Sequence, residues 1–184
     1  MVYNLRLHIF IKKSSLDSMR LLYFFILLFS LNSEMYSQKL FKSFVFQMPM
    51  EEARLILSKD SKILKNLAFG EGTVYAVRKK SLVGRDDRLV SMNLGSKKNL
   101  NLEQAGTYMK KSRNYFESKK FKTVYAQENW SNPILVKKNL PCIRFVDTEK
   151  TVVVEVDPRG QGSVYNIFVT FYNYDWFLKK ALGK

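Results

Sequence analysis

Hydrophobic residues follow different spacings along this chain, and each spacing predicts a different kind of element. Residues 21–31 form an apolar block in which Ser30 is the one polar member. Residues 102–116 carry apolar side chains at helical spacing, whereas residues 164–174 are continuously rich in aromatic and β-branched residues. These patterns therefore predict an apolar leader followed by a mixture of helices and strands.

The apolar block has the flanks of a secretory signal peptide. Arg20 precedes it directly, and the short polar stretch 32–37 follows it. As a helix its 11 residues span about 16 Å, well short of a hydrocarbon layer of about 30 Å. We therefore expect residues 1–37 to be a signal peptide cut after Ser37. The alternatives are a cut after Ser33, a true start at Met19, an uncleaved membrane anchor over residues 20–36, or a buried core helix.

Two helices are predicted in the remaining domain, residues 38–184. The first begins at Pro49, and Glu51 and Glu52 complement the positive end of its dipole. The second begins at Asn101 as N-cap, with Gln104 three residues later. One broad face of this second helix is largely apolar and is expected to be buried; it comprises Leu102, Ala105, Tyr108, Met109, Ser112, Tyr115 and Phe116.

The other segments of this domain read mostly as strands. The predicted strands are residues 41–46, 63–69, 73–80, 89–94, 122–128, 134–137, 142–147, 151–156 and 164–174. Polar loops are expected at residues 84–88 and 157–162, and a frayed basic tail from residue 175. Hairpin-length connections favour antiparallel pairing, so we predict an α+β fold, a mostly antiparallel sheet backed by two helices. A helix-then-strands layout appears twice, at 48–94 and from 101 to 147 and beyond.

Composition removes several kinds of chemistry. The chain has one histidine, His8, and one cysteine, Cys142. Removing residues 1–37 would remove His8, so the remaining domain could build neither a Ser-His-Asp triad nor a zinc site of the Cys/His type. No glycine-rich phosphate loop is present. We therefore expect no cofactor, no metal and no catalytic residue. Cys142 is expected to be a buried, inert thiol, with a disulfide between two chains as the alternative.

An enzyme built from this sequence would have to use carboxylates alone. Glu51 and Glu52 point about 100° apart on a helix and do not converge. A glycan hydrolase needs two acidic groups roughly 5–10 Å apart in one cleft. The residues open to that role are Asp86, Asp87, Glu128, Glu155 and Asp157. A carboxylate-only hydrolase stays an alternative function.

The strongest signal is the charge. The chain has 31 Lys and Arg against 16 Asp and Glu, a net charge of +15. Basic residues gather around the second helix and are candidate contacts for an anionic surface; they are Lys97, Lys98, Lys110, Lys111, Arg113, Lys119, Lys120 and Lys122. Aromatic residues lie among them, so a nucleic-acid-binding protein is a further alternative. Helical spacing argues against it, because Tyr108, Tyr115 and Phe116 fall on the face expected to be buried.

The order of elements over residues 41–174 resembles small exported bacterial α+β proteins of the BamE-like and beta-lactamase-inhibitor-protein-like type. The segment Tyr36-Ser37-Gln38 and the Phe-, Tyr-, Lys- and Asn-rich composition also look like exported proteins of Bacteroidetes. No cysteine follows the leader where the BamE-like group carries its lipid. The resemblance implies a protein that works by binding, and it carries over no functional residue.

These observations together favour an exported, non-enzymatic binding protein, periplasmic or at the cell surface. The expected partner is an envelope protein or an anionic envelope component. A membrane contact would run through the N-terminal segment alone, if that segment is not cleaved.

Overall fold

The computed structural model describes residues 38–129, 132, 134, 142–161 and 163–183. The chain divides into two units, Met1–Tyr36 and Ser37–Lys184, and all described residues belong to the second. The predicted signal peptide, residues 1–37, and most of the strand predicted for residues 134–137 lie outside the described residues.

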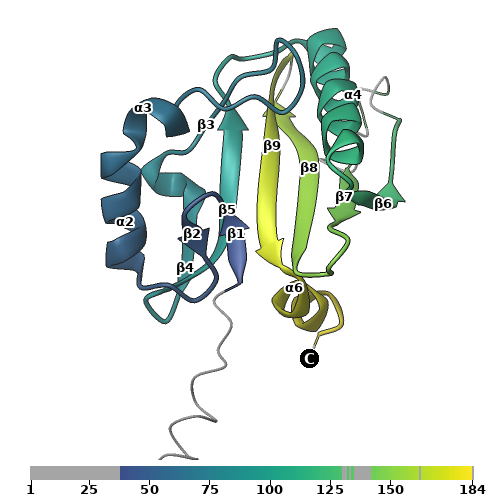
Figure 1. Ribbon diagram of the computed structural model, residues 1–184. Helices are drawn as coiled ribbons and strands as arrows, with labels where there is room; N and C mark the ends of the chain where they lie inside the picture. The colour runs from purple at the N-terminus through teal and green to yellow at the C-terminus, as the bar shows by residue number, and fades with distance from the viewer. Residues whose placement is uncertain (1–37, 130–131, 133, 135–141, 162, 184) are drawn as a thin grey trace, which may run out of the picture. The chain divides into compact units, whose positions relative to one another are not determined.

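A seven-stranded antiparallel sheet forms the centre of this unit (Figure 1). Its strands are β3 (Tyr75–Ala76), β4 (Leu82–Arg85), β5 (Arg88–Ser96), β6 (Lys122–Ala126), β7 (Ile143–Val146), β8 (Val152–Gln161) and β9 (Val164–Asn173). The strands lie in the order β3-β5-β9-β8-β7-β6, and β4 also pairs with β5. Every pairing is antiparallel, which confirms the predicted α+β class.

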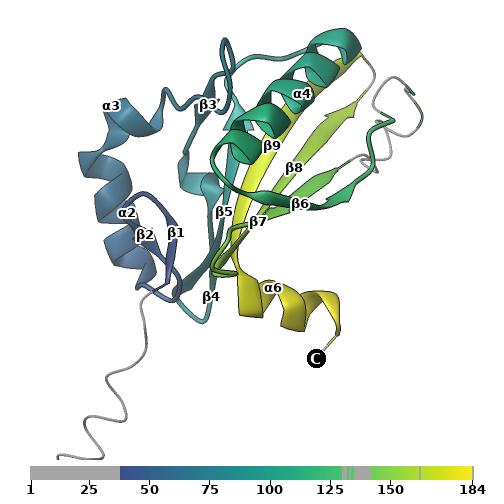
Figure 2. The same cartoon turned by 45° about the vertical axis from the view of Figure 1, so that its right-hand side comes forward.

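The long helix α4 (Leu102–Ser118) lies across one face of the sheet, against β8 and β9 (Figure 2). The predicted capping box is present: the Gln104 amide donates to Asn101 Oδ1 at 2.9 Å, and the Asn101 amide donates to Gln104 Oε1 at 3.0 Å. Five residues of the predicted face are buried, namely Ala105, Tyr108, Met109, Ser112 and Phe116. The helix is therefore specified by its cap and its apolar stripe together.

A second helical segment packs beside β4 and β5. It consists of α2 (Met50–Lys59) followed at once by the single turn α3 (Ser61–Leu64). Met50 and Ala53 are buried in the same core as α4. The strand predicted for residues 63–69 is wrong, because its first residues complete α3 and only Leu67 forms a bridge, to Tyr75.

The N-terminal strand prediction also needs correction. Residues 41–46 do not form one strand but part of a small two-stranded sheet, β1 (Lys39–Phe41) and β2 (Phe44–Val45). Lys42 between them has a positive φ of 51°, which turns the chain back. The strand predicted for residues 73–80 shrinks to β3, and the short 3₁₀ helix η1 (Lys79–Ser81) follows it.

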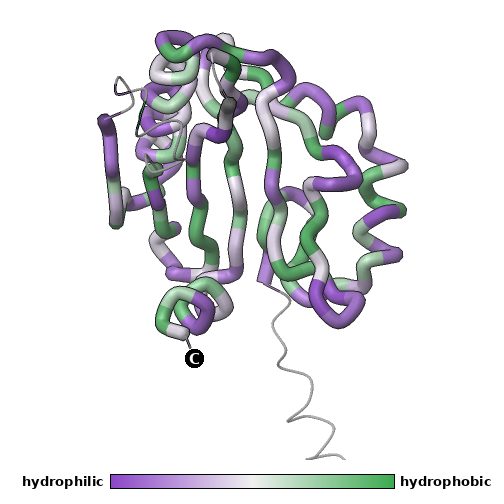
Figure 3. Tube along the Cα trace, turned by 180° about the vertical axis from the view of Figure 1, so that it is seen from behind, coloured by the Kyte–Doolittle hydropathy of each residue, from purple (hydrophilic) through white to green (hydrophobic). Residues whose placement is uncertain are grey.

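Strand β9 is central, because β5 pairs on one side and β8 on the other. The face of β9 that carries Tyr165, Ile167, Val169 and Phe171 is wholly buried. An aromatic cluster joins this face to α4: the Phe69 ring lies 5.3 Å from Phe116 and 5.9 Å from Phe171 between centroids. Hydrophobic positions concentrate on the strands, whereas the β4–β5 turn is hydrophilic (Figure 3).

The turn predicted at residues 157–162 is wrong. Strand β8 continues through Asp157 and Pro158 to Gln161, paired with β9 throughout. Among the described strands, pairing of β8 with β7 ends at Val156, so Pro158 pairs only with β9. The N–H that proline lacks therefore interrupts no hydrogen-bond ladder between the described strands. The tail predicted to fray from residue 175 is instead mostly helix α6 (Tyr174–Ala181), capped where Asn173 Oδ1 accepts from the Trp176 amide at 2.8 Å.

Candidate anion-binding groove

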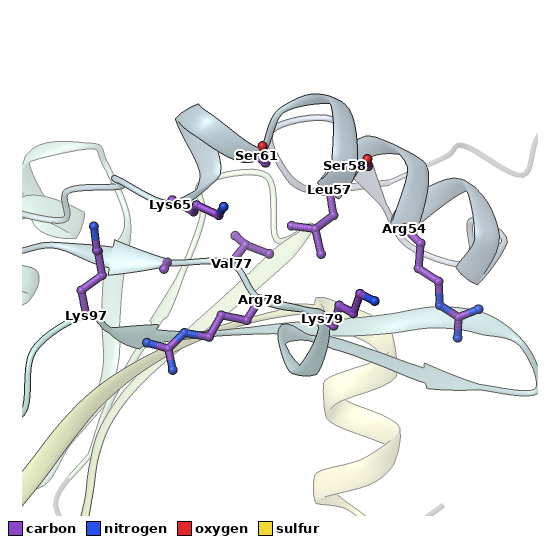
Figure 4. A pocket seen from close by; sticks show the side chains of 10 residues that line it. Arg54, Leu57, Ser58, Ser61, Lys65, Val77, Arg78, Lys79 and Lys97 are labelled. Atoms are coloured by element: carbon purple, nitrogen blue, oxygen red, sulfur yellow. The ribbon is translucent and has the colours of Figure 1, made fainter.

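A groove of about 700 Å³ lies between the α2–α3 segment and the stretch that runs from β3 into η1 (Figure 4). Its walls come from three parts of the chain that are distant in sequence. The lining residues are Arg54, Leu57, Ser58, Ser61, Lys65, Ala76, Val77, Arg78, Lys79 and Lys97.

Helical spacing and backbone hydrogen bonds fix the two walls. Arg54, Leu57 and Ser58 stand three and four residues apart, so they share one side of α2. The Val77 amide donates to the Leu64 carbonyl at 2.8 Å, which holds the strand-side wall against the end of α3. The Lys97 amide donates to the Val74 carbonyl at 2.9 Å and places Lys97 at the same opening.

The floor of the groove is apolar. Ala76 and Val77 are buried, and Leu57 is half-buried and points toward Val77 in Figure 4. The rim is polar and open to solvent, because Arg54, Lys65, Arg78, Lys79 and Lys97 are all exposed. An apolar floor with a few polar groups at its edge is the usual composition of a site for a small molecule.

The charged residues that line the groove are all positive. Five of its ten lining residues carry a positive charge, and none is acidic. Within the described part of the chain none of the five cations forms an ion pair; the Lys97 ammonium donates instead to Asn66 Oδ1 at 2.9 Å. Gathering like charges around one hollow raises the local positive potential, which favours an anionic occupant.

The structure brings only Lys97 of the eight predicted contacts into this groove. Lys110, Lys111 and Arg113 lie on α4, and Arg113 is held by Glu117 at 2.9 Å and by Glu128. Lys98, Lys119, Lys120 and Lys122 are exposed outside it. The sequence reasoning missed Arg54, Lys65, Arg78 and Lys79. The spacing of Arg54 with Leu57 and Ser58, and the run from Arg78 to Lys80, were the available signals.

Lys119 instead borders a second, smaller groove of about 340 Å³ near the end of α4. Aromatic rings dominate its walls, and Lys39, Lys42 and Lys119 surround them together with Asp147. The Lys119 ammonium lies 5.9 Å from the centroid of the Tyr115 ring. The presence of a carboxylate makes this groove less selective for anions than the first.

The carboxylates named for a hydrolase are only partly brought together. Glu155 and Asp157 share one face of β8, with Cα atoms about 7 Å apart by strand geometry. Arg144 binds Glu155 at 2.5 Å and Arg159 binds Asp157 at 2.7 Å. Burial raises the pKa of Asp157, against the opposing effect of the Arg159 guanidinium. Neither carboxylate lines either of these two grooves.

The other acidic candidates lie elsewhere. Asp86 and Asp87 form the β4–β5 turn with positive φ values of 51° and 55°, as expected for a two-residue hairpin turn. Glu128 is bound to Arg113, and Glu51 and Glu52 are exposed in the first turn of α2.

Cys142 is buried at 8% exposure beside β7. Burial raises the pKa of its thiol to about 11, which keeps it protonated at neutral pH. This agrees with the expectation of an inert thiol.

Among the described residues, no group of three or more His, Cys, Asp or Glu side chains is arranged to hold a metal ion. No helix among those residues has the length and apolar character to cross a membrane.

Comparisons with protein-family models, with curated proteins and with solved structures returned no match.

Proposed function

We propose that this chain is an exported, non-enzymatic binding protein of the bacterial cell envelope, and that its basic groove binds an anionic envelope component. The observation that carries the proposal is the set of five cations around one apolar floor, with no carboxylate among the lining residues. Such a site attracts an anion from a distance and rewards an apolar part of the same ligand by burial.

Nucleic acid is the weaker candidate. Stacking on bases needs exposed aromatic faces, and Tyr108 and Phe116 among the basic residues of α4 are buried against the sheet. No aromatic residue lines the basic groove. The groove thus offers charge and aliphatic surface, which suit a ligand with an anionic group and an aliphatic body.

Binding of anilinonaphthalene sulfonate tests the proposal, because this fluorescent probe combines a sulfonate with an apolar body. We expect saturable binding that weakens with salt, since the cations are exposed and screened over about 10 Å at 0.1 M. The variant Arg54→Glu/Lys65→Glu should bind about tenfold more weakly, because two attractive charges become repulsive.

The matched control is Lys98→Glu/Lys110→Glu, which makes the same change of net charge at exposed lysines outside the groove. We expect less than a twofold effect. Equal weakening in both variants would attribute binding to overall charge and refute a localised site. Unchanged binding in the groove variant would refute it as well.

A further inference from the structure

Four of the five cations of the groove stand at its two ends, and the fifth, Arg78, begins on the strand-side wall between them with its guanidinium directed toward Lys97 (Figure 4). Lys65 and Lys97 lie at one end, and Arg54 and Lys79 lie at the other. Leu57 and Val77 occupy the stretch between the two pairs. The groove therefore presents two positive ends separated by an aliphatic middle.

We propose that the groove takes an elongated ligand with an aliphatic middle and an anionic group at each end. This inference rests on the proposed function and names the chemistry of its ligand. A ligand with a single anionic head would satisfy the cations at one end and leave those at the other end without a counter-charge. A cavity of about 700 Å³ falls within the roughly 300–1,000 Å³ of small-molecule sites, which favours a small molecule over a macromolecular partner.

The spacing of Arg54 and Lys65 along the helical wall gives an approximate length for that ligand. Arg54 and Lys65 are eleven residues apart, which as one straight helix would be about 16 Å. The break between α2 and α3 at Asp60 shortens the span. An extended carbon chain advances about 1.25 Å per bond, since three bonds separate Cα atoms 3.8 Å apart. The span thus corresponds to roughly 10–12 bonds, the length of a dicarboxylic acid of about 12 carbons.

Two series of competitors against anilinonaphthalene sulfonate test this inference. One series contains unbranched α,ω-dicarboxylic acids of about 6 to about 16 carbons, and the other contains monocarboxylic acids of the same lengths. Simple hydrophobic binding predicts that the monoacid always binds more tightly, because it is the more apolar molecule. Two-ended recognition predicts the reverse near 12 carbons, where we expect the diacid to bind about fivefold more tightly.

Neutralising either end should abolish the advantage of the diacid. The variants Lys65→Gln/Arg78→Gln/Lys97→Gln and Arg54→Gln/Lys79→Gln should each bring the diacid to the affinity of the monoacid. The control variant Lys98→Gln/Lys110→Gln should keep the difference. A monoacid that binds as tightly as the diacid at every length would overturn the inference, as would an affinity without an optimum in length.

The two proposals would be refuted by different results. If the probe binds in a salt-dependent manner that the groove variants weaken, but the diacid has no advantage, only the two-ended ligand is refuted. If neither the probe nor any competitor binds in that manner, the basic groove is not the binding site and both proposals fall. Displacement of the probe by an acidic peptide but by no diacid would also overturn the small-molecule assignment.

Discussion

The wall of the groove is tied to α4 by one buried hydrogen bond, and its energy can be predicted. The hydroxyl groups of Tyr75 on β3 and Ser112 on α4 lie 2.9 Å apart, and both residues are fully buried. Burial raises the pKa of Tyr75 far above its ordinary value, so the hydroxyl stays protonated in the folded protein. A buried hydroxyl without a partner costs about 1–3 kcal/mol.

The two single substitutions should not be equivalent. In Tyr75→Phe the serine loses its partner, but a helical serine can turn toward the carbonyl four residues earlier, so we expect a loss of about 1 kcal/mol in the free energy of unfolding. In Ser112→Ala the rigid phenol keeps a buried hydroxyl with no replacement, and we expect about 2–3 kcal/mol. The double variant should lose at least about 1 kcal/mol less free energy of unfolding than the two single variants added together, because it leaves no hydroxyl without a partner.

Urea denaturation followed by tryptophan fluorescence measures these differences, provided that the denaturant slope stays constant across the set. Ser118→Ala on the exposed end of the same helix is the matched control and should cost less than about 0.5 kcal/mol. If the losses of the single variants simply add, the two hydroxyls do not interact in solution and the reasoning is refuted.

Further outcomes are expected at two glycines, at Cys142 and at the N-terminal segment. Gly160→Ala should destabilise the protein by about 1–3 kcal/mol in the same assay, because a Cβ would lie 2.3 Å from Cδ1 of Tyr165. Gly106→Ala on α4, with no atom within 4 Å of the new carbon, should stabilise by about 0.5–1 kcal/mol, and equal effects would discredit the packing. The raised pKa of Cys142 means that the unfolded chain ionises first, so stability should fall as the pH rises from about 9 to about 11. Cys142→Ala should lack this part of the pH dependence, and an identical pH profile would contradict the assignment. Finally, native protein in an envelope fraction should have an intact mass without residues 1–37, whereas full-length chains confined to the cytosol would contradict export.

Some elements follow from local sequence because their local and tertiary signals agree. Helix α4 has a capping box at Asn101 and an apolar stripe, and both act over a few residues. Strand β9 carries β-branched and aromatic residues on both faces, as a central strand requires. Tertiary packing then only reinforces what the segment already prefers.

Other elements depend on partners that the local sequence does not reveal. Asp157 and Pro158 have turn chemistry, but ten consecutive pairs with β9 outweigh it, because the proline sits where β7 no longer pairs. Residues 63–69 have strand-like composition, yet Leu64 is buried at the end of α3. Propensity was overruled in both places by long-range contacts.

The groove was the hardest feature to predict. Its cations come from α2, from the end of α3, from η1 and from the residue after β5. No local pattern joins Arg54 to Lys97, because the pairing of β3 with the end of β5 and the hydrogen bond from Val77 to Leu64 bring them to one groove. The density of lysines around α4 drew the prediction to that surface, whereas the basic groove lies between the α2–α3 segment and the stretch from β3 to η1.

The position of Pro158 has a consequence for how this protein behaves at high concentration. Beyond Val156 the outer side of β8 has no described neighbour, and an unpaired strand of this kind can recruit a strand from another molecule. Pro158 has no amide hydrogen, so it interrupts the row of backbone donors that a strand of a second molecule would need for pairing. Pro158 therefore disfavours fibre-like self-association through this strand edge.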